Sequence, residues 1–161
     1  MAAGSTYTPI ATSSATGSTI TFSSISGSYT DLVLQGTAVS GSSNCALTLQ
    51  FNGDTGNNYS VTILLGDGTS AQSAANTNSP SMQGGRASTA GSAFSFSIQN
   101  YSNSTTYKTA LSRGSYAGSA TLAYVGLWRN TSAITSITVG MTGGNSFASG
   151  SQLTLYGIAA A

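Results

Sequence analysis

Apolar and polar residues alternate in short runs along most of this 161-residue sequence. The clearest runs are CALTLQF at 45–51 and YSVTILL at 59–65, on either side of the polar segment 52–58. Alternation with period two places apolar side chains on one face of a β-strand. Because the Asn, Gly and Asp residues between the runs favour tight turns, the sequence predicts a β-hairpin over residues 45–65. The side chains predicted to face the core from this hairpin are those of Leu47, Leu49, Phe51, Val61, Ile63 and Leu65.

Further alternating runs predict strands over most of the remaining sequence. Pro9 cannot donate a backbone hydrogen bond, so residues 1–12 are expected to form an extended N-terminal arm at a sheet edge. About eight to ten short strands without a significant helix predict an all-β fold, an antiparallel β-sandwich with a jelly-roll-like topology. The other predicted strands cover residues 18–23, 29–39, 93–100, 107–113, 119–129, 134–141 and 152–158.

Residues 66–92 lack this alternation. Clusters of Gly, Ser, Asn and Pro predict long surface loops there, with room for one helical turn near residues 70–75. The chain is long enough to bury a core, and we expect a single domain over residues 1–161. The strand at 119–129 is apolar on both faces, which predicts that the core covers one face and that a loop or a neighbouring subunit covers the other.

Charged residues make up only 4% of the sequence, and the net charge is +1. An average soluble domain has roughly 25% charged residues. No basic patch is present to bind nucleic acid, and no apolar run approaches the roughly 18 residues that span a membrane. The sequence therefore predicts neither nucleic acid nor a membrane as a partner. Cys45 is the single cysteine, so an internal disulfide is impossible, and we expect it to be a small buried hydrophobic residue.

Catalysis and metal binding have few candidate residues. Histidine and glutamate are absent, and the three carboxylates are Asp31, Asp54 and Asp67. A pair of aspartates could serve a glycosidase, and Asp54 with its neighbouring asparagines resembles a calcium loop. Both Asp54 and Asp67 lie in Gly-rich turns, however, where Asp commonly bonds local backbone groups. We therefore expect a protein that is not an enzyme, with no catalytic residues, no cofactor and no metal.

Partner contacts are expected instead from a few cationic and aromatic residues. Trp and Arg are enriched at interface hot spots, so Trp128 and Arg129 are a candidate stacked pair between subunits, and a pair within one chain is an equal alternative. Arg113 and Arg86 are further candidate contacts. The eight tyrosines suit either carbohydrate stacking or hydroxyl contacts at the rim of a sandwich.

Four segments carry a recognisable combination of motifs. They are FNGDTGNNYS at 51–60, SIQNYSNSTTYKTALSR at 97–113, GLWRNTSAITSITV at 126–139 and FASGSQLTLYGI at 147–158. Together they resemble a family of small all-β bacteriophage virion structural proteins of the tail-fibre and head-decoration type. The combination of FNGD, QNY and LYGI is more specific than any one of these motifs. The resemblance covers most of the chain and implies a non-enzymatic, oligomeric particle component with no catalytic residues to transfer.

This resemblance implies a place in the virion, either on the capsid surface or on the tail. The sequence shows no coiled coil or stalk repeat of the kind typical of a long fibre, which favours a capsid decoration or cement protein. Its partners would then be the major capsid protein or other virion proteins, and a homotrimer is expected at local three-fold positions. The alternative is a tail fibre or receptor-binding tip that recognises a host surface glycan, favoured by the tyrosines and by the loops predicted at 66–92.

Overall fold

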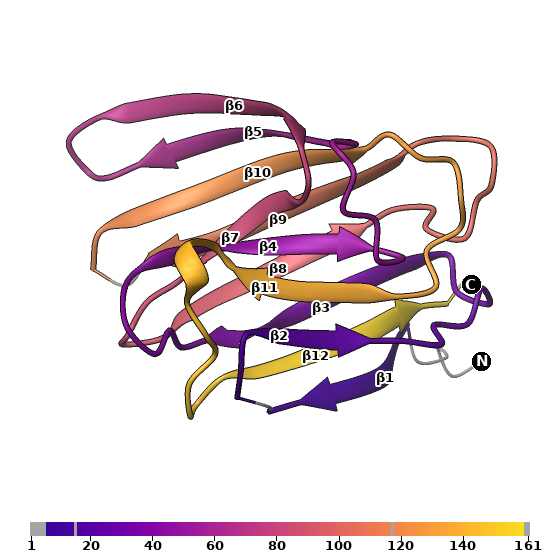
Figure 1. Ribbon diagram of the computed structural model, residues 1–161, viewed down its shortest axis with the longest axis horizontal. Coiled ribbons are helices and arrows are strands. Elements are labelled where there is room, and N and C mark those ends of the chain that lie inside the picture. Colours follow the sequence, from indigo (N-terminus) through magenta and orange to yellow (C-terminus); the bar gives the residue numbers. More distant parts are fainter. Residues whose placement is uncertain (1–5, 15, 117, 160–161) are drawn as a thin grey trace.

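The structure, a computed structural model, describes residues 6–14, 16–116 and 118–159. These residues form twelve strands in two antiparallel sheets and one short 3-10 turn, which confirms the predicted all-β sandwich (Figure 1). The strands are β1 (Tyr7–Ser13), β2 (Thr19–Phe22), β3 (Asp31–Ala38), β4 (Cys45–Phe51), β5 (Tyr59–Gly66), β6 (Ala71–Ser79), β7 (Met82–Ala87), β8 (Ser92–Ile98), β9 (Lys108–Tyr116), β10 (Ala120–Trp128), β11 (Ile137–Met141) and β12 (Gln152–Ile158), and the turn is η1 (Thr142–Gly144).

The strand order is that of a jelly roll with two added hairpins. Strands pair in a nested fashion, β1 with β12, β2 with β11, β3 with β8 and β4 with β7, which is the pairing of a double-sheet jelly roll. These eight strands build the smaller sheet, β2-β11-β4-β7, and one half of the larger sheet, β1-β12-β3-β8. The hairpins β9–β10 and β5–β6 continue the larger sheet in the order β9-β10-β5-β6. We call these four strands the extension.

The N-terminal arm predicted over residues 1–12 is an edge strand in its described part. From Tyr7 onward, β1 pairs with β12 at the edge of the larger sheet. The pairing shifts register just after Pro9, where a backbone donor is missing. Residues 1–5 of the predicted arm lie outside the described residues.

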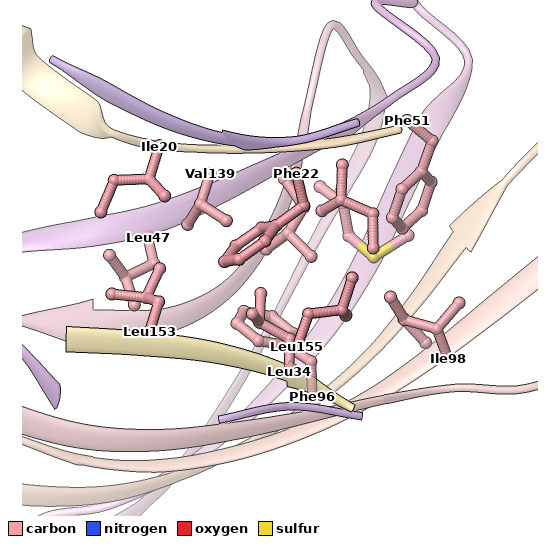
Figure 2. Close-up of a cluster of buried hydrophobic side chains, with 14 of the residues drawn as sticks. Ile20, Phe22, Leu34, Leu47, Phe51, Phe96, Ile98, Val139, Leu153 and Leu155 are labelled. Atoms are coloured by element: carbon pink, nitrogen blue, oxygen red, sulfur yellow. The ribbon is translucent and has the colours of Figure 1, made fainter. Parts of the chain in front are cut away.

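The main core lies between the two sheets, where inward side chains of the jelly-roll strands meet (Figure 2). Cys45 is buried at one end of this core, as expected, and burial raises the pKa of its thiol. The core side chains labelled in Figure 2 are Ile20, Phe22, Leu47, Phe51 and Val139 from the smaller sheet, and Leu34, Phe96, Ile98, Leu153 and Leu155 from the larger sheet.

The hairpin predicted over residues 45–65 is wrong in its pairing, although both of its strands are present. β4 lies in the smaller sheet between β11 and β7, whereas β5 lies in the larger sheet between β10 and β6. Residues 52–58 therefore cross from one sheet to the other as an arch. Alternation identified the strands, but it carries no information about which strand pairs with which.

Side chains at both ends hold this arch in place. The Asn52 amide donates to the Ala133 carbonyl at 2.8 Å and accepts from the Thr135 backbone N–H at 2.8 Å. At the other end, the Tyr59 hydroxyl accepts from the Phe51 backbone N–H at 2.9 Å. Burial of this phenol raises the pKa of Tyr59 to about 12. Asn52 therefore ties the start of the arch to a segment far along the chain, and the Tyr59 hydroxyl closes the arch locally.

Residues 66–92 form strands β6 and β7, so the long loops and the helical turn predicted there are wrong. β6 pairs with β5 after a tight turn in which the Asp67 carboxylate accepts from the Ser70 backbone N–H at 2.6 Å. β7 passes against the larger sheet at Gly84, where a Cβ atom would collide with the Phe96 ring. The Asp67 turn therefore positions β6, and the close contact at Gly84 positions β7, although neither strand shows apolar alternation.

The extension reaches beyond the smaller sheet, as the position of β5 and β6 in Figure 1 shows. β7, the nearest strand of the smaller sheet, packs against β9 and β10. A second buried cluster forms on this inner face from Val61, Leu122 and Tyr124, and Ile63 and Leu65 pack against it while partly exposed. The inner side of the extension is therefore only partly covered.

Candidate interaction surface

The outward face of the extension carries apolar side chains that remain largely exposed. Leu111 on β9, Val125 on β10 and Leu64 on β5 are 41%, 52% and 59% exposed. Val125 lies directly opposite Leu111, and Leu64 lies opposite Ala123, the neighbouring outward residue of β10. Opposite residues on antiparallel strands have Cβ atoms about 5 Å apart and diagonal ones about 7–8 Å. Val125 therefore lies close to Leu111, and Leu64 joins them diagonally through the exposed Ala123 to form one patch. We call Leu64, Leu111 and Val125 the outer patch.

The outer patch belongs to two rows of side chains that cross the larger sheet from β12 to β6. Arg113 is the only charged residue in these two rows, so the face combines apolar contact with uncharged hydrogen-bonding groups. The first row is Tyr156, Val33, Ser97, Leu111, Val125, Thr62 and Ala75, and the second is Thr154, Gln35, Ser95, Arg113, Ala123, Leu64 and Ser73.

A shallow depression of about 290 Å³ lies on this face beside the outer patch. Its lining includes Tyr7, Val33, Leu111 and Arg113. The Tyr7 ring, which lines the depression, packs edge-on against the Tyr156 ring, with 6.0 Å between the ring centroids. The depression gives the face a shape that a protruding side chain of a partner can enter.

Trp128 is the predicted partner contact that the structure places in the interior. Its side chain is 1% exposed and its ring stacks on Tyr59, with ring centroids 6.3 Å apart and planes at 15°. The indole Nε1 donates to Asp54 Oδ2 at 2.7 Å. Trp128 therefore anchors the arch to the end of β10, which corrects the expectation that its ring faces another subunit.

Arg129 is also held within the chain. Its guanidinium donates to the Asn57 carbonyl at 2.7 Å and to the Asn78 side-chain oxygen at 2.9 Å. Because Asn57 lies in the arch and Asn78 lies near the end of β6, Arg129 joins these two segments. For Arg129 the geometry therefore favours the contact within the chain over a contact between subunits. Among the four predicted partner contacts, only Arg113 lies on the outer face.

Arg86 lies on the opposite side of the extension, beside a cavity of about 310 Å³. The cavity is also lined by Leu65, Asp67, Tyr116 and Leu122. The guanidinium carbon lies 5.8 Å from the centroid of the Tyr116 ring, a cation–π distance. This cavity therefore offers one cation, one carboxylate and an apolar wall, but it is separate from the outer patch.

Tyr124 adds an unusual polar group to the inner side of the extension. Its hydroxyl is buried and has no hydrogen-bond partner among the described residues. Burial raises the pKa of Tyr124, and the charge of Arg86 together with side-chain hydrogen bonding from Arg86 opposes that shift. Arg86 is therefore the polar group that the Tyr124 hydroxyl faces, although their geometry falls short of an ordinary hydrogen bond.

Lys108 is buried, which the sequence does not indicate. Its side chain is 1% exposed at the start of β9, and burial lowers the pKa of its ammonium. The Nζ atom donates to the Thr106 carbonyl at 2.7 Å and to the Thr131 carbonyl at 2.9 Å. Lys108 thus joins the segments before β9 and after β10, and its charge does not reach a partner surface.

The carboxylates are bonded within turns and are not grouped into a site. Asp54 accepts from the Asn58 side chain at 3.0 Å and from the Gly56 backbone N–H at 2.8 Å, in addition to the Trp128 indole. Asp31 accepts from the Asn100 backbone N–H at 2.6 Å. Within residues 6–14, 16–116 and 118–159, no three acidic, Cys or His side chains cluster as metal ligands would. The arch therefore behaves as a hydrogen-bonded turn.

Asp54 predicts a loss of stability in acid. Burial would raise its pKa, but bonds from Trp128, Asn58 and Gly56 outweigh this effect and hold the pKa of Asp54 below its ordinary value of 3.8. A carboxylate with a depressed folded-state pKa stabilises the fold above its unfolded-state pKa, and this contribution is lost as the pH falls through the folded-state pKa. Urea unfolding from about pH 6 to pH 2 should therefore show a decline in the free energy of unfolding below about pH 4.

Asp54→Asn should reduce that decline, because it removes the titrating group and keeps much of the shape of the arch. The free energy of unfolding of Asp54→Asn should still decline somewhat in acid, because backbone hydrogen bonds from Ser70 and Thr69 also lower the pKa of Asp67. An acid slope in Asp54→Asn as steep as that of the wild type would show that Asp54 does not stabilise the fold through its charge.

Comparisons with known proteins do not add a relative. No family model, no curated protein and no solved structure matches this chain. No helix in the described part of the chain is long and apolar enough to cross a membrane.

Proposed function

We propose that the protein is a non-enzymatic structural component of a bacteriophage virion, a decoration or cement protein that binds the assembled head shell. The observation that supports this proposal most directly is the outer patch of Leu64, Leu111 and Val125 on a nearly uncharged sheet face. Contiguous exposed apolar patches are typical of protein interaction sites. The FNGD and LYGI motifs, which resemble those of virion structural proteins, provide the second line of support.

The architecture suits such a role. Double-sheet jelly rolls occur in viral capsid and lectin domains, and the function of each depends on surfaces added to the fold. Here the added hairpins β5–β6 and β9–β10 carry the outer patch. A protein that binds the assembled shell more tightly than its separate subunits stabilises the shell by mass action. Because the face has few charges, its binding should depend only weakly on salt.

Cryo-electron microscopy of purified particles tests the location. We expect the chain on the capsid surface, with the outer face of the larger sheet toward the major capsid protein. A homotrimer should then occupy local three-fold positions. Density for this chain only at the tail, or at no position of the particle, contradicts the proposal.

Val125→Asp should weaken binding to the head shell by at least about tenfold, because it places an unpaired charge in an apolar contact. Thr21→Asp is the matched control, since Thr21 is exposed on β2, on the outward face of the smaller sheet. Both variants should unfold at the wild-type urea concentration. Co-sedimentation with particles that lack the protein measures binding, and equal binding of the two variants would exclude the outer patch as the docking face.

A tail-tip protein that recognises a host glycan is the second candidate function. The cavity beside Arg86 favours it, because its volume of about 310 Å³ and its mixture of Asp67, Gln72, Arg86 and Tyr116 suit a sugar ring with several hydroxyl groups. Glycan-array binding that Arg86→Ala abolishes would favour this alternative. Binding to heads without any glycan binding would favour the decoration role.

A further inference from the structure

β6 is an unprotected edge of the larger sheet. It pairs with β5 on one side only, and its residues from Ala71 to Asn78 are all exposed. An edge strand presents unpaired backbone N–H and C=O groups along its free side, which are a template for another strand. Residue-for-residue pairing with β5 runs from Ala71 to Asn76, so this part of the edge is regular.

The other sheet edges have features that discourage strand addition. β1 contains Pro9 and an irregular register beside it. β2 has only four residues. β7 carries Arg86 and an irregular register with β4. β6 has nine residues, none of them charged and none of them proline. Its own irregular register with β5 is confined to the end of the strand after Asn76, so the usual protection of an exposed edge is absent from Ala71 to Asn76.

We propose that β6 is the interface between two copies of this chain, which pair antiparallel through their β6 strands about a two-fold axis. The two larger sheets would then form one continuous sheet. This inference concerns self-association of the chain and does not depend on the proposed place in the virion.

The geometry of a two-fold axis fixes the pairing. An antiparallel pair within one continuous sheet requires the axis to be perpendicular to the sheet, so opposite residues must share a face. Ala74 lies near the middle of the regular run, and placing it on the axis sets Gln72 opposite Asn76 of the second copy and Ser73 opposite Ala75 of the second copy. The amides of Gln72 and Asn76 can exchange hydrogen bonds across this interface.

A second copy is the occupant that the surface chemistry favours. Two-fold pairing brings two copies of the same strand together, so charges on this edge would face like charges and repel them. The sequence AQSAANTNS has no charged residue and avoids that repulsion. The same symmetry keeps both outer faces on one side of the joined sheet. The two outer patches would then face the same way on the joined sheet, with the two uncharged β6 strands between them.

This arrangement differs from the homotrimer expected from the family resemblance. Two-fold pairing uses the same surface on both copies, whereas a three-fold ring needs two different surfaces. Sedimentation equilibrium of the purified chain, from micromolar to near-millimolar concentration, should give twice the chain mass of 16.0 kDa at the upper end. A monomer at every concentration, or a trimer, would overturn the proposal.

Ala74→Lys tests the register, because it places two ammonium groups opposite each other on the axis. We expect the dimer dissociation constant to rise at least about tenfold. Mixing Ala74→Lys with Ala74→Asp should restore association, which a merely misfolded variant could not do. Ala11→Lys on β1, an exposed residue at the opposite edge of the same sheet, should leave the dimer unchanged.

Ala74→Cys gives a covalent test of the same pairing. Opposite residues in an antiparallel pair have Cα atoms about 4.5–5.5 Å apart, which is within the range that a disulfide spans. Mild oxidation should therefore yield a cross-linked dimer, and Cys45 is buried and should not interfere. Cross-linking of Ala11→Cys to the same extent, or none in Ala74→Cys, would show that the β6 edges do not meet.

Discussion

Gly36→Ala is expected to lower the free energy of unfolding by about 3 kcal/mol or more, at the upper end of the cost of overpacking. Gly36 lies in β3, where a Cβ atom would collide with the carbonyl oxygen of Gln152 and lie 2.9 Å from Leu153 Cα. The obstructing atoms belong to the backbone of β12, so no side-chain rotation can relieve the contact. Separation of β12 from β3 would also disturb β1, which pairs with the other side of β12.

Gly66→Ala is the matched control for this prediction. Gly66 ends β5, and a Cβ atom placed on it meets nothing within 4 Å. The free energy of unfolding of Gly66→Ala should stay within about 0.5 kcal/mol of the wild-type value or rise slightly, because Ala reduces the conformational entropy of the unfolded chain. Urea unfolding of both variants measures the difference. Equal stabilities would mean that β3 and β12 can separate at Gly36 without cost.

Alternation in the sequence was sufficient to predict most strands but not their partners. The run QLTLYGI predicts β12 from Gln152 to Ile158, as the structure has it, and the runs on either side of residues 52–58 predict β4 and β5. β12 pairs with β1 and with β3, two strands from the first 38 residues of the chain, and no local pattern carries that information. A local hairpin was therefore predicted where the chain crosses between sheets.

β6 could not be predicted for a different reason. Its sequence AQSAANTNS has no apolar alternation because neither of its faces is buried, and its conformation follows from the Asp67 turn and from pairing with β5. Such a strand is indistinguishable from a polar loop until its partner is known. The same lack of burial leaves its edge free for a second copy.

The candidate surface was partly visible in the sequence. The strand at 119–129 is apolar on both faces, and the predicted cover for its second face was a loop or a neighbouring subunit. The structure leaves Val125 on that face exposed, so the described chain supplies no full cover. For Trp128 the sequence leaves a contact between subunits and a contact within the chain equally open, because its hydrogen-bond acceptor, Asp54, is 74 residues away.

Phe51→Ala should lower the free energy of unfolding by about 3–5 kcal/mol, the usual cost of removing a fully buried phenylalanine ring. Phe51 is 0% exposed at the end of β4, where the arch begins. Its ring centroid lies 5.5 Å from that of Trp128 in an edge-on contact and 6.2 Å from that of Tyr59. Truncation would leave a cavity beside two aromatic side chains that hydrogen bonds hold in place, so the site cannot easily collapse.

Leu64→Ala separates this effect from a general loss of apolar area. Leu64 comes from the other strand flanking the arch. The alternation of β5 places it on the face away from Val61, Ile63 and Leu65, and it is 59% exposed. Its replacement should change stability by about 0.5 kcal/mol or less. Thermal and urea unfolding at low protein concentration, where the β6 interface is not populated, measure both variants. A small effect of Phe51→Ala, similar to that of Leu64→Ala, would show that the aromatic cluster at the arch does not support the core, because only a buried ring leaves a costly cavity.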